Sequence, residues 1–179
     1  MTEQNTATPV ATPPSLAFGL AGLVLIFACT GAWIYLGGRI LHLQSFYASF
    51  VFAWYWGIVD KAEFSRLPSS ILGSLLGVAV AWQLSYLSAH FATAGLAVGV
   101  GVIAVVLYMQ IMHWGAYVIN PATMLFLAVF TAPQLLGKVD DVDAGATIIA
   151  GALYMAAVIY VLKRVTGMGA PAKVPLEAV

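Results

Sequence analysis

Six polar or helix-breaking residues stand within or beside the apolar stretches of this 179-residue chain and are its candidates for solute chemistry. They are Gln83, Gln110, His113, Asn120, Pro121 and Thr123. Amide and hydroxyl groups both donate and accept hydrogen bonds, and an imidazole can relay a proton. In an apolar surrounding such groups are costly unless they find partners, so they usually face the interior of a helical bundle. We expect them to line a solute route or, as the alternative, to fasten helices together.

Asn120 and Pro121 carry the clearest of these signals, because they interrupt an apolar run within residues 110–124. Proline removes a backbone donor and clashes with the preceding turn of a helix. The freed carbonyl needs a partner, and membrane transporters use such broken helices to bind solutes. Asn120 stands only about one turn inside the expected helix, so a kink without a solute role is the alternative. A second alternative is that residues 115–123 form a re-entrant segment.

Composition predicts that these residues belong to a membrane protein. Hydrophobic residues make up 62% of the chain and charged residues 8%, whereas soluble domains carry about 25% charged residues. Every charge lies between apolar runs or in a tail, as expected where a bilayer excludes charge. The expected partner is therefore the lipid bilayer. The formal net charge is zero and no basic patch occurs, so nucleic-acid binding has no electrostatic basis.

Six segments approach the length of about 20 apolar residues that a helix needs to cross a bilayer. They run over residues 15–36, 43–59, 68–89, 93–113, 116–132 and 144–162. The sequence thus predicts an all-α, multi-pass transmembrane helical bundle of about six helices, with the fifth helix kinked or broken at Asn120-Pro121. We expect one transmembrane domain over residues 15–164, preceded by a disordered cytoplasmic tail (1–14) and followed by a second cytoplasmic tail (165–179).

Basic residues predict the orientation, because cytoplasmic loops carry an excess of Lys and Arg. With six spans and an inner amino terminus, the inner side holds Lys61, Arg66, Lys163, Arg164 and Lys173, and the outer side holds Arg39 and Lys138. This imbalance favours a cytoplasmic position for both termini.

Small residues recur at three- and four-residue spacing in the third and fourth segments. They are Ser70, Gly73, Ser74, Gly77 and Ala81, followed by Gly95 and Gly99. Such stripes let helix backbones approach closely in lipid. They predict packing seams inside the bundle or, as the alternative, the interface of a homo-oligomer.

No enzyme constellation is found, and we predict no catalysis, no cofactor and no metal site. No carboxylate stands inside an apolar segment, and the three histidines fall near different helix ends. Cys29 is the only cysteine, which excludes an intramolecular disulfide and a multi-cysteine metal site. The acidic run Asp140-Asp141-Val142-Asp143 precedes the last segment. We expect Asp143 to cap that helix, with a weak divalent-cation site as the alternative.

Three features together resemble a known family. They are an aromatic second segment, the run Gly77-Val78-Ala79-Val80-Ala81-Trp82 and the proline-centred Asn120-Pro121-Ala122-Thr123. This pattern is similar to the small bacterial inner-membrane proteins grouped as domain of unknown function 1097, over most of residues 16–164. The family favours a glycine-rich loop after the second helix, whereas this chain has Asp60-Lys61-Ala62-Glu63. The resemblance implies a bacterial, multi-pass inner-membrane protein, and the family has no established activity.

We therefore expect a multi-pass integral membrane protein that acts as a small-solute channel or transporter. A structural or accessory membrane protein without transport activity is the alternative. A polar cavity that reaches Asn120 would favour the first function, and a dry, fully packed helix there would favour the second.

Overall fold

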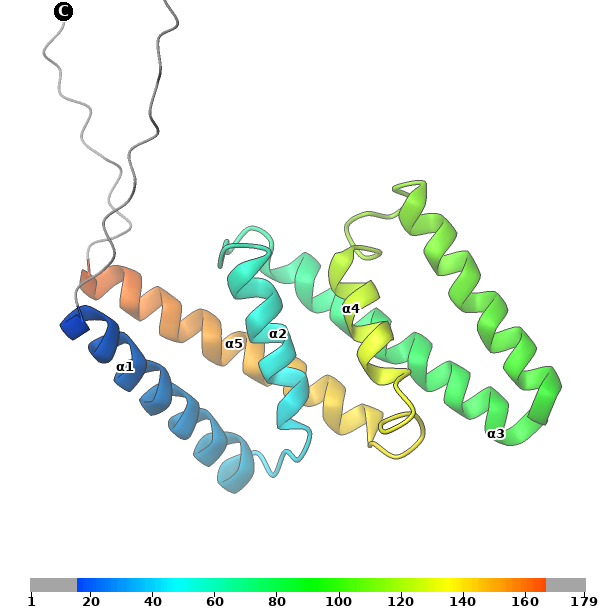
Figure 1. Ribbon diagram of the computed structural model, residues 1–179, viewed down its shortest axis with the longest axis horizontal. Coiled ribbons are helices and arrows are strands. Elements are labelled where there is room, and N and C mark those ends of the chain that lie inside the picture. The colour runs from blue at the N-terminus through cyan, green and yellow to red at the C-terminus, as the bar shows by residue number, and fades with distance from the viewer. Residues whose placement is uncertain (1–15, 167–179) are drawn as a thin grey trace, which may run out of the picture. The chain divides into compact units, whose positions relative to one another are not determined.

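The computed structural model describes residues 16–166, and the regular elements in this range are all helical. They are α1 (Leu16–Tyr35), the π-helix η1 (Leu36–Ile40), α2 (Phe46–Ile58), α3 (Leu67–Ile111), α4 (Pro121–Phe130) and α5 (Asp141–Thr166) (Figure 1). The all-helical class is confirmed, but the described residues form five α-helices and not six. The tail predicted over residues 1–14, and all but the first two residues of the tail predicted over 165–179, lie outside the described residues.

Two compact units divide the chain, residues 1–32 and residues 33–179. The described part of the first unit is the apolar helix α1 up to Ala32. The second unit begins at Trp33 and contains η1 and every later helix. All contacts discussed below lie within the second unit.

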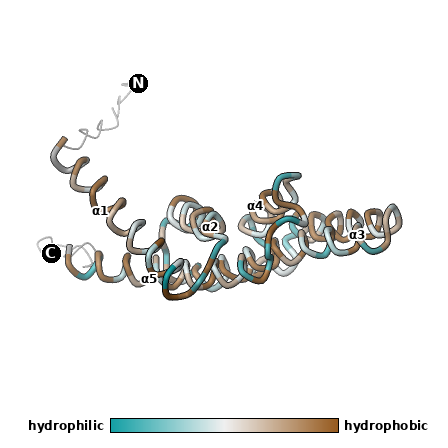
Figure 2. Tube along the Cα trace, turned by 90° about the horizontal axis from the view of Figure 1, so that it is seen from below, coloured by the Kyte–Doolittle hydropathy of each residue, from teal (hydrophilic) through white to brown (hydrophobic). Residues whose placement is uncertain are grey.

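Three of the described helices are long and apolar enough to cross a membrane. These stretches are Gly19–Ile40, Leu67–Ile111 and Asp141–Val165, and Figure 2 shows the hydrophobic colour along them. The chain is therefore compatible with a membrane protein. Helices α2 and α4 have 13 and 10 residues, which makes them about 20 and 15 Å long at 1.5 Å per residue. Both are shorter than the about 30 Å of a bilayer's hydrocarbon core, so the second and fifth predicted spans are not full-length helices.

The third and fourth predicted segments form one element, α3, which turns back on itself. Ala92 interrupts the helix with φ 46° and ψ −127°. Beyond this residue, Gly99 lies so close to the first arm that an added Cβ would be 3.2 Å from the Leu84 Cα atom. The two arms of α3 therefore run side by side in opposite directions (Figure 1).

The stripe of small residues on the first arm of α3 is a packing seam within the chain. A Cβ added at Gly77 would come 2.6 Å from the carbonyl oxygen of Thr123 in α4. This close approach lets α4 lie directly on α3 and bury Phe126, which joins a core that includes Phe52 of α2 and Ile148 of α5. Here the intrachain seam, and not the alternative subunit interface, accounts for the stripe.

Helix α2 is fixed to α5 at both of its ends. At its start, the backbone N–H groups of Gln44 and Ser45 donate to the Asp143 carboxylate, with a shortest distance of 2.7 Å. Just past its end, the Lys163 ammonium donates to the carbonyl oxygen of Ala62 at 3.3 Å. Asp143 therefore ties two helices together. The predicted cap at Asp143 is wrong, because the preceding carboxylate of Asp140 accepts the N–H groups at the start of α5.

Candidate functional site

The expected break at Asn120-Pro121 is the beginning of α4. The Asn120 Oδ1 atom accepts hydrogen bonds from the backbone N–H groups of Ala122 at 3.0 Å and Thr123 at 3.3 Å. In return the Thr123 hydroxyl accepts from the Asn120 N–H at 3.2 Å, which completes a capping box. Pro121 follows in the first turn, where its missing N–H has no helical partner to lose. The predicted kink is therefore not confirmed, because this proline stands at a helix start where it is tolerated.

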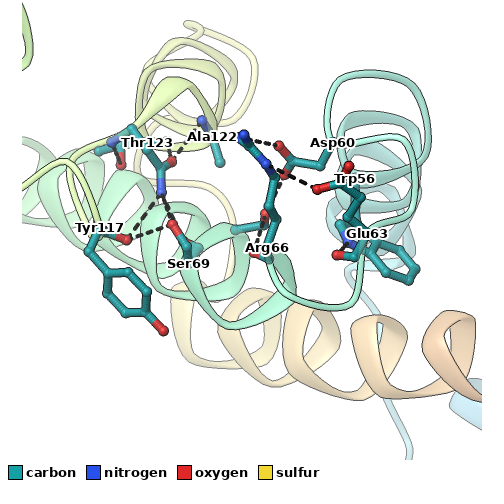
Figure 3. A network of polar contacts seen from close by, with 10 residues as sticks. Trp56, Asp60, Glu63, Arg66, Ser69, Tyr117, Ala122 and Thr123 are labelled. Carbon is teal, nitrogen blue, oxygen red and sulfur yellow. Dashed lines mark hydrogen bonds and ion pairs between the residues drawn. The ribbon is translucent and has the colours of Figure 1, made fainter.

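The other half of the Asn120 amide ties the start of α4 to the start of α3. Its Nδ2 atom donates to the Ser69 carbonyl oxygen at 2.9 Å and lies 3.1 Å from the Ser69 hydroxyl. The same hydroxyl donates to the Tyr117 carbonyl oxygen at 2.7 Å (Figure 3). Asn120 is only 8% exposed, and both ends of its amide are used within the chain.

A buried carboxylate lies near these residues, contrary to the expectation of none in the interior. Asp60 follows the end of α2 and is 7% exposed, and its Oδ2 atom accepts a hydrogen bond from the Ser70 hydroxyl of α3. Lys61 and Ala62 both take left-handed conformations with φ 52°, which non-glycine residues rarely adopt. The Trp56 indole holds the turn by donating to the Glu63 carbonyl oxygen at 3.0 Å (Figure 3).

Arg66 is the nearest cation to the Asp60 carboxylate, but the ion pair is loose. The Arg66 Nη1 atom lies 3.8 Å from Asp60 Oδ1, and its Nε atom lies 3.4 Å from Glu63 Oε2. Charge-assisted hydrogen bonds are usually about 2.7–2.9 Å long. The Arg66 side chain is 65% exposed. One exposed guanidinium is therefore shared between two carboxylates without a close contact to either.

These groups surround a polar pocket of about 200 Å³ between the end of α2, the start of α3 and the start of α4. Its walls include Tyr55, Asp60, Arg66, Ser69, Ser70 and Asn120. One water molecule takes about 30 Å³ of liquid volume, so the pocket has room for several waters or for one small solute. A polar cavity thus reaches Asn120.

The structure brings only part of the predicted site together. Asn120 and Pro121 line the pocket, and Thr123 is fully buried behind them. His113 is exposed in the turn after α3, with φ 55°, and is not on the wall of this pocket.

Gln83 and Gln110 lie on the two arms of α3, also away from the pocket wall. Their Oε1 atoms are buried and accept no hydrogen bond from the described residues. They are therefore interior acceptors without a protein partner in this part of the chain.

Seven wall residues were absent from the predicted set, and four of them, which carry charged groups or aliphatic hydroxyls, are Asp60, Arg66, Ser69 and Ser70. The sequence held a weak signal for them. Asp60 and Arg66 bracket the short loop before α3, and two serines follow Pro68 in the first turn of that helix. Such a pattern indicates polar groups gathered at a helix start, but it does not say that they face a cavity.

Comparisons with protein-family models, curated proteins and solved structures give no match to this chain. The resemblance to domain of unknown function 1097 stays a prediction. Within residues 16–166, no group of three or more His, Cys, Asp or Glu side chains is placed to hold a metal ion. The chemistry of the pocket is therefore inferred from its own geometry.

Proposed function

We propose that this chain is an integral membrane protein that binds a small polar solute in the pocket beside Asp60 and moves it across the bilayer as a channel or transporter. The observation that carries the proposal is the pocket itself. It is a polar cavity of about 200 Å³ that reaches Asn120, in a chain with three helices apolar enough to cross a membrane. An inner-membrane location with both termini in the cytoplasm is part of the proposal.

The mechanism is the replacement of water by protein hydrogen bonds. A polar solute that leaves water loses hydrogen bonds, and the loss is costly unless other partners replace them. At the pocket, the carboxylate of Asp60 and the hydroxyl of Ser70 supply such partners. Elsewhere on α3, away from the pocket wall, the amide oxygens of Gln83 and Gln110 are buried acceptors without a partner among the described residues. The irregular backbone between α3 and α4 also fits this function, because membranes tolerate it where it lines a wet cavity.

A specific observation favours the second candidate, a structural or accessory role. Both ends of the Asn120 amide are used to cap α4 and to dock it on Ser69. If the role is structural or accessory, Asn120→Leu would change assembly or stability, and the native chain would carry no solute in any assay.

A matched pair of bulky substitutions tests the proposed transport. Ala116 is exposed and lines the pocket, whereas Ala128 is exposed on α4 and does not line it. We expect proteoliposomes with the native chain to take up at least one solute from a panel of small neutral, cationic and anionic compounds. Ala116→Trp should reduce this uptake because it fills the pocket, and Ala128→Trp should leave it unchanged. Uptake no faster than in protein-free liposomes would contradict the proposal, as would equal effects of the two variants.

A further inference from the structure

Among Asp60, Ser69, Ser70 and Asn120, the hydrogen-bonding capacity left open belongs mainly to acceptors, whereas the exposed guanidinium of Arg66 keeps open donors. Asn120 uses both ends of its amide within the chain. The Ser69 hydroxyl donates to Tyr117 and accepts from Asn120, and the Ser70 hydroxyl donates to Asp60. A carboxylate offers about four lone-pair sites, of which Ser70 occupies one at Asp60. A solute that binds at the Asp60 carboxylate must therefore donate hydrogen bonds.

The charge of Asp60 favours cations over neutral hydrogen-bond donors as the solute. A buried carboxylate is costly unless it is paired and hydrogen-bonded. The nearest partner, Arg66, stays 3.8 Å away and is largely exposed. A small cation inside the pocket could approach to about 2.7–2.9 Å, the usual length of a charge-assisted hydrogen bond. At Asp60 such a solute would gain more than a neutral one of the same shape, and an anion would be repelled by this carboxylate.

Arg66 can give way to such a cation because a second carboxylate already holds it. Its Nε atom is nearer to Glu63, at 3.4 Å, than its Nη1 atom is to Asp60. The guanidinium can therefore leave the pocket wall and keep an ionic partner. Its present position also shows that a planar guanidinium group fits on the pocket wall within 3.8 Å of the Asp60 carboxylate.

We infer that the pocket is a site for small cations of the guanidinium or amine class, with Asp60 as the counter-charge and Arg66 as a displaceable internal competitor. The inference rests on the proposed function, because it names the solute class of the same pocket. It assigns opposite effects to neighbouring charged residues. Removal of Asp60 abolishes binding, removal of Arg66 tightens it, and removal of Glu63 weakens it because Arg66 then pairs with Asp60 alone.

Guanidinium and urea are suitable probes, because they share a planar shape and differ in charge. Equilibrium dialysis of each radiolabelled compound against the detergent-solubilised full chain measures binding directly. We expect guanidinium to bind at least about tenfold more tightly than urea, the difference expected from one charge-assisted hydrogen bond. Asp60→Asn should remove this preference. Equal binding of the two probes to the native chain would overturn the inference.

The exposed residues keep the test informative even if Asp60→Asn does not fold. Glu63, Arg66 and Lys61 are all exposed, so their neutral variants should fold. Arg66→Gln should strengthen guanidinium binding and Glu63→Gln should weaken it. Lys61→Gln removes the same charge from the same loop, does not alter the pocket wall, and should change binding little. Weaker binding in Arg66→Gln, or equal strengthening by Lys61→Gln, would overturn the role of Arg66.

Parallel uptake assays separate this inference from the proposed function. If proteoliposomes take up urea but not guanidinium, and Ala116→Trp blocks the uptake, the cation class is wrong and transport stands. If guanidinium binds at the pocket but no solute enters the liposomes, the cation site stands and transport is wrong.

Discussion

Two acidic regions of this chain use their carboxylates in different ways. In the run before α5, Asp140 accepts the N–H groups of Val142 at 2.9 Å and Asp143 at 3.1 Å. Asp143 in turn accepts those of Gln44 and Ser45. All these donors are backbone groups at or just before helix starts, which cannot move away without unfolding a turn. Asp140 and Asp143 therefore fasten helices, and the apolar pocket of about 310 Å³ beside this run is lined by Asp141 and Val142 and by neither of these two carboxylates.

The region around Asp60 has partners that can move. Its carboxylate meets the Ser70 hydroxyl, which can rotate, and the guanidinium of Arg66, which is loosely held. It also lines a pocket, although it is 7% exposed. The comparison teaches that burial alone does not identify a functional carboxylate. What distinguishes Asp60 from Asp140 and Asp143 is that its partners are exchangeable and that it lines a polar pocket.

The largest effect on stability is expected from Asp143→Ala. This change leaves the N–H groups of Gln44 and Ser45 without their charged acceptor, and hydrogen bonds to charged groups contribute about 1.5–3 kcal/mol each. We expect a clear fall in the free energy of unfolding, measured by denaturation in detergent. Asp143→Asn keeps an acceptor oxygen and should lose less. Unchanged stability in Asp143→Ala would show that the contact between α2 and α5 does not contribute to the free energy of unfolding.

A smaller loss is expected from Asn120→Ala, which removes the N-cap of α4. Loss of such a cap costs about 0.5–2 kcal/mol, and the contact with Ser69 is lost as well. Hydrogen exchange should rise in the first turn of α4 and at residues 116–119, while α5 stays protected. Asn120→Ser supplies a capping hydroxyl and should recover part of the loss. Exchange that rises equally throughout the second unit would contradict a local role.

The smallest effect on stability is expected from Asp60→Asn. An amide oxygen can still accept the bond from Ser70, and Arg66 retains Glu63 as a partner. We therefore expect a change below about 1 kcal/mol, the size of an ordinary neutral hydrogen bond, although solute binding is lost. Thermal unfolding without and with guanidinium measures both effects, because a ligand stabilises the native state that binds it. A large loss of stability without ligand would show that Asp60, like Asp140 and Asp143, mainly holds helices together.

The sequence predicted the helical class, and it predicted apolar stretches long enough to span a membrane, because composition and segment length determine both. It misjudged Asn120-Pro121 because a proline is disruptive inside a helix and harmless in its first turn. Only the position of the helix start distinguishes the two cases. The sequence placed Asn120 about one turn inside the helix, and the structure places it at the cap.

The burial of Asp60 could not be predicted from the sequence for a different reason. Its burial depends on a turn in which Lys61 and Ala62, neither of them glycine, both have positive φ. Nothing in their residue types predicts that conformation, so Asp60 was not among the predicted site residues. The reversal of α3 at Ala92 is a different case, because the predicted segments 68–89 and 93–113 end and begin on either side of this residue.

The most direct test of the account is whether closing the pocket stops the solute. Cys29 is the only cysteine, so Ala116→Cys in a Cys29→Ala background gives a single thiol on the pocket wall. Guanidinium uptake by proteoliposomes is measured before and after labelling with a bulky methanethiosulfonate reagent. The account predicts that labelling lowers uptake to the level of protein-free liposomes, and that the same labelling at Ala128→Cys has no effect. Equal uptake before and after labelling at position 116 would contradict it.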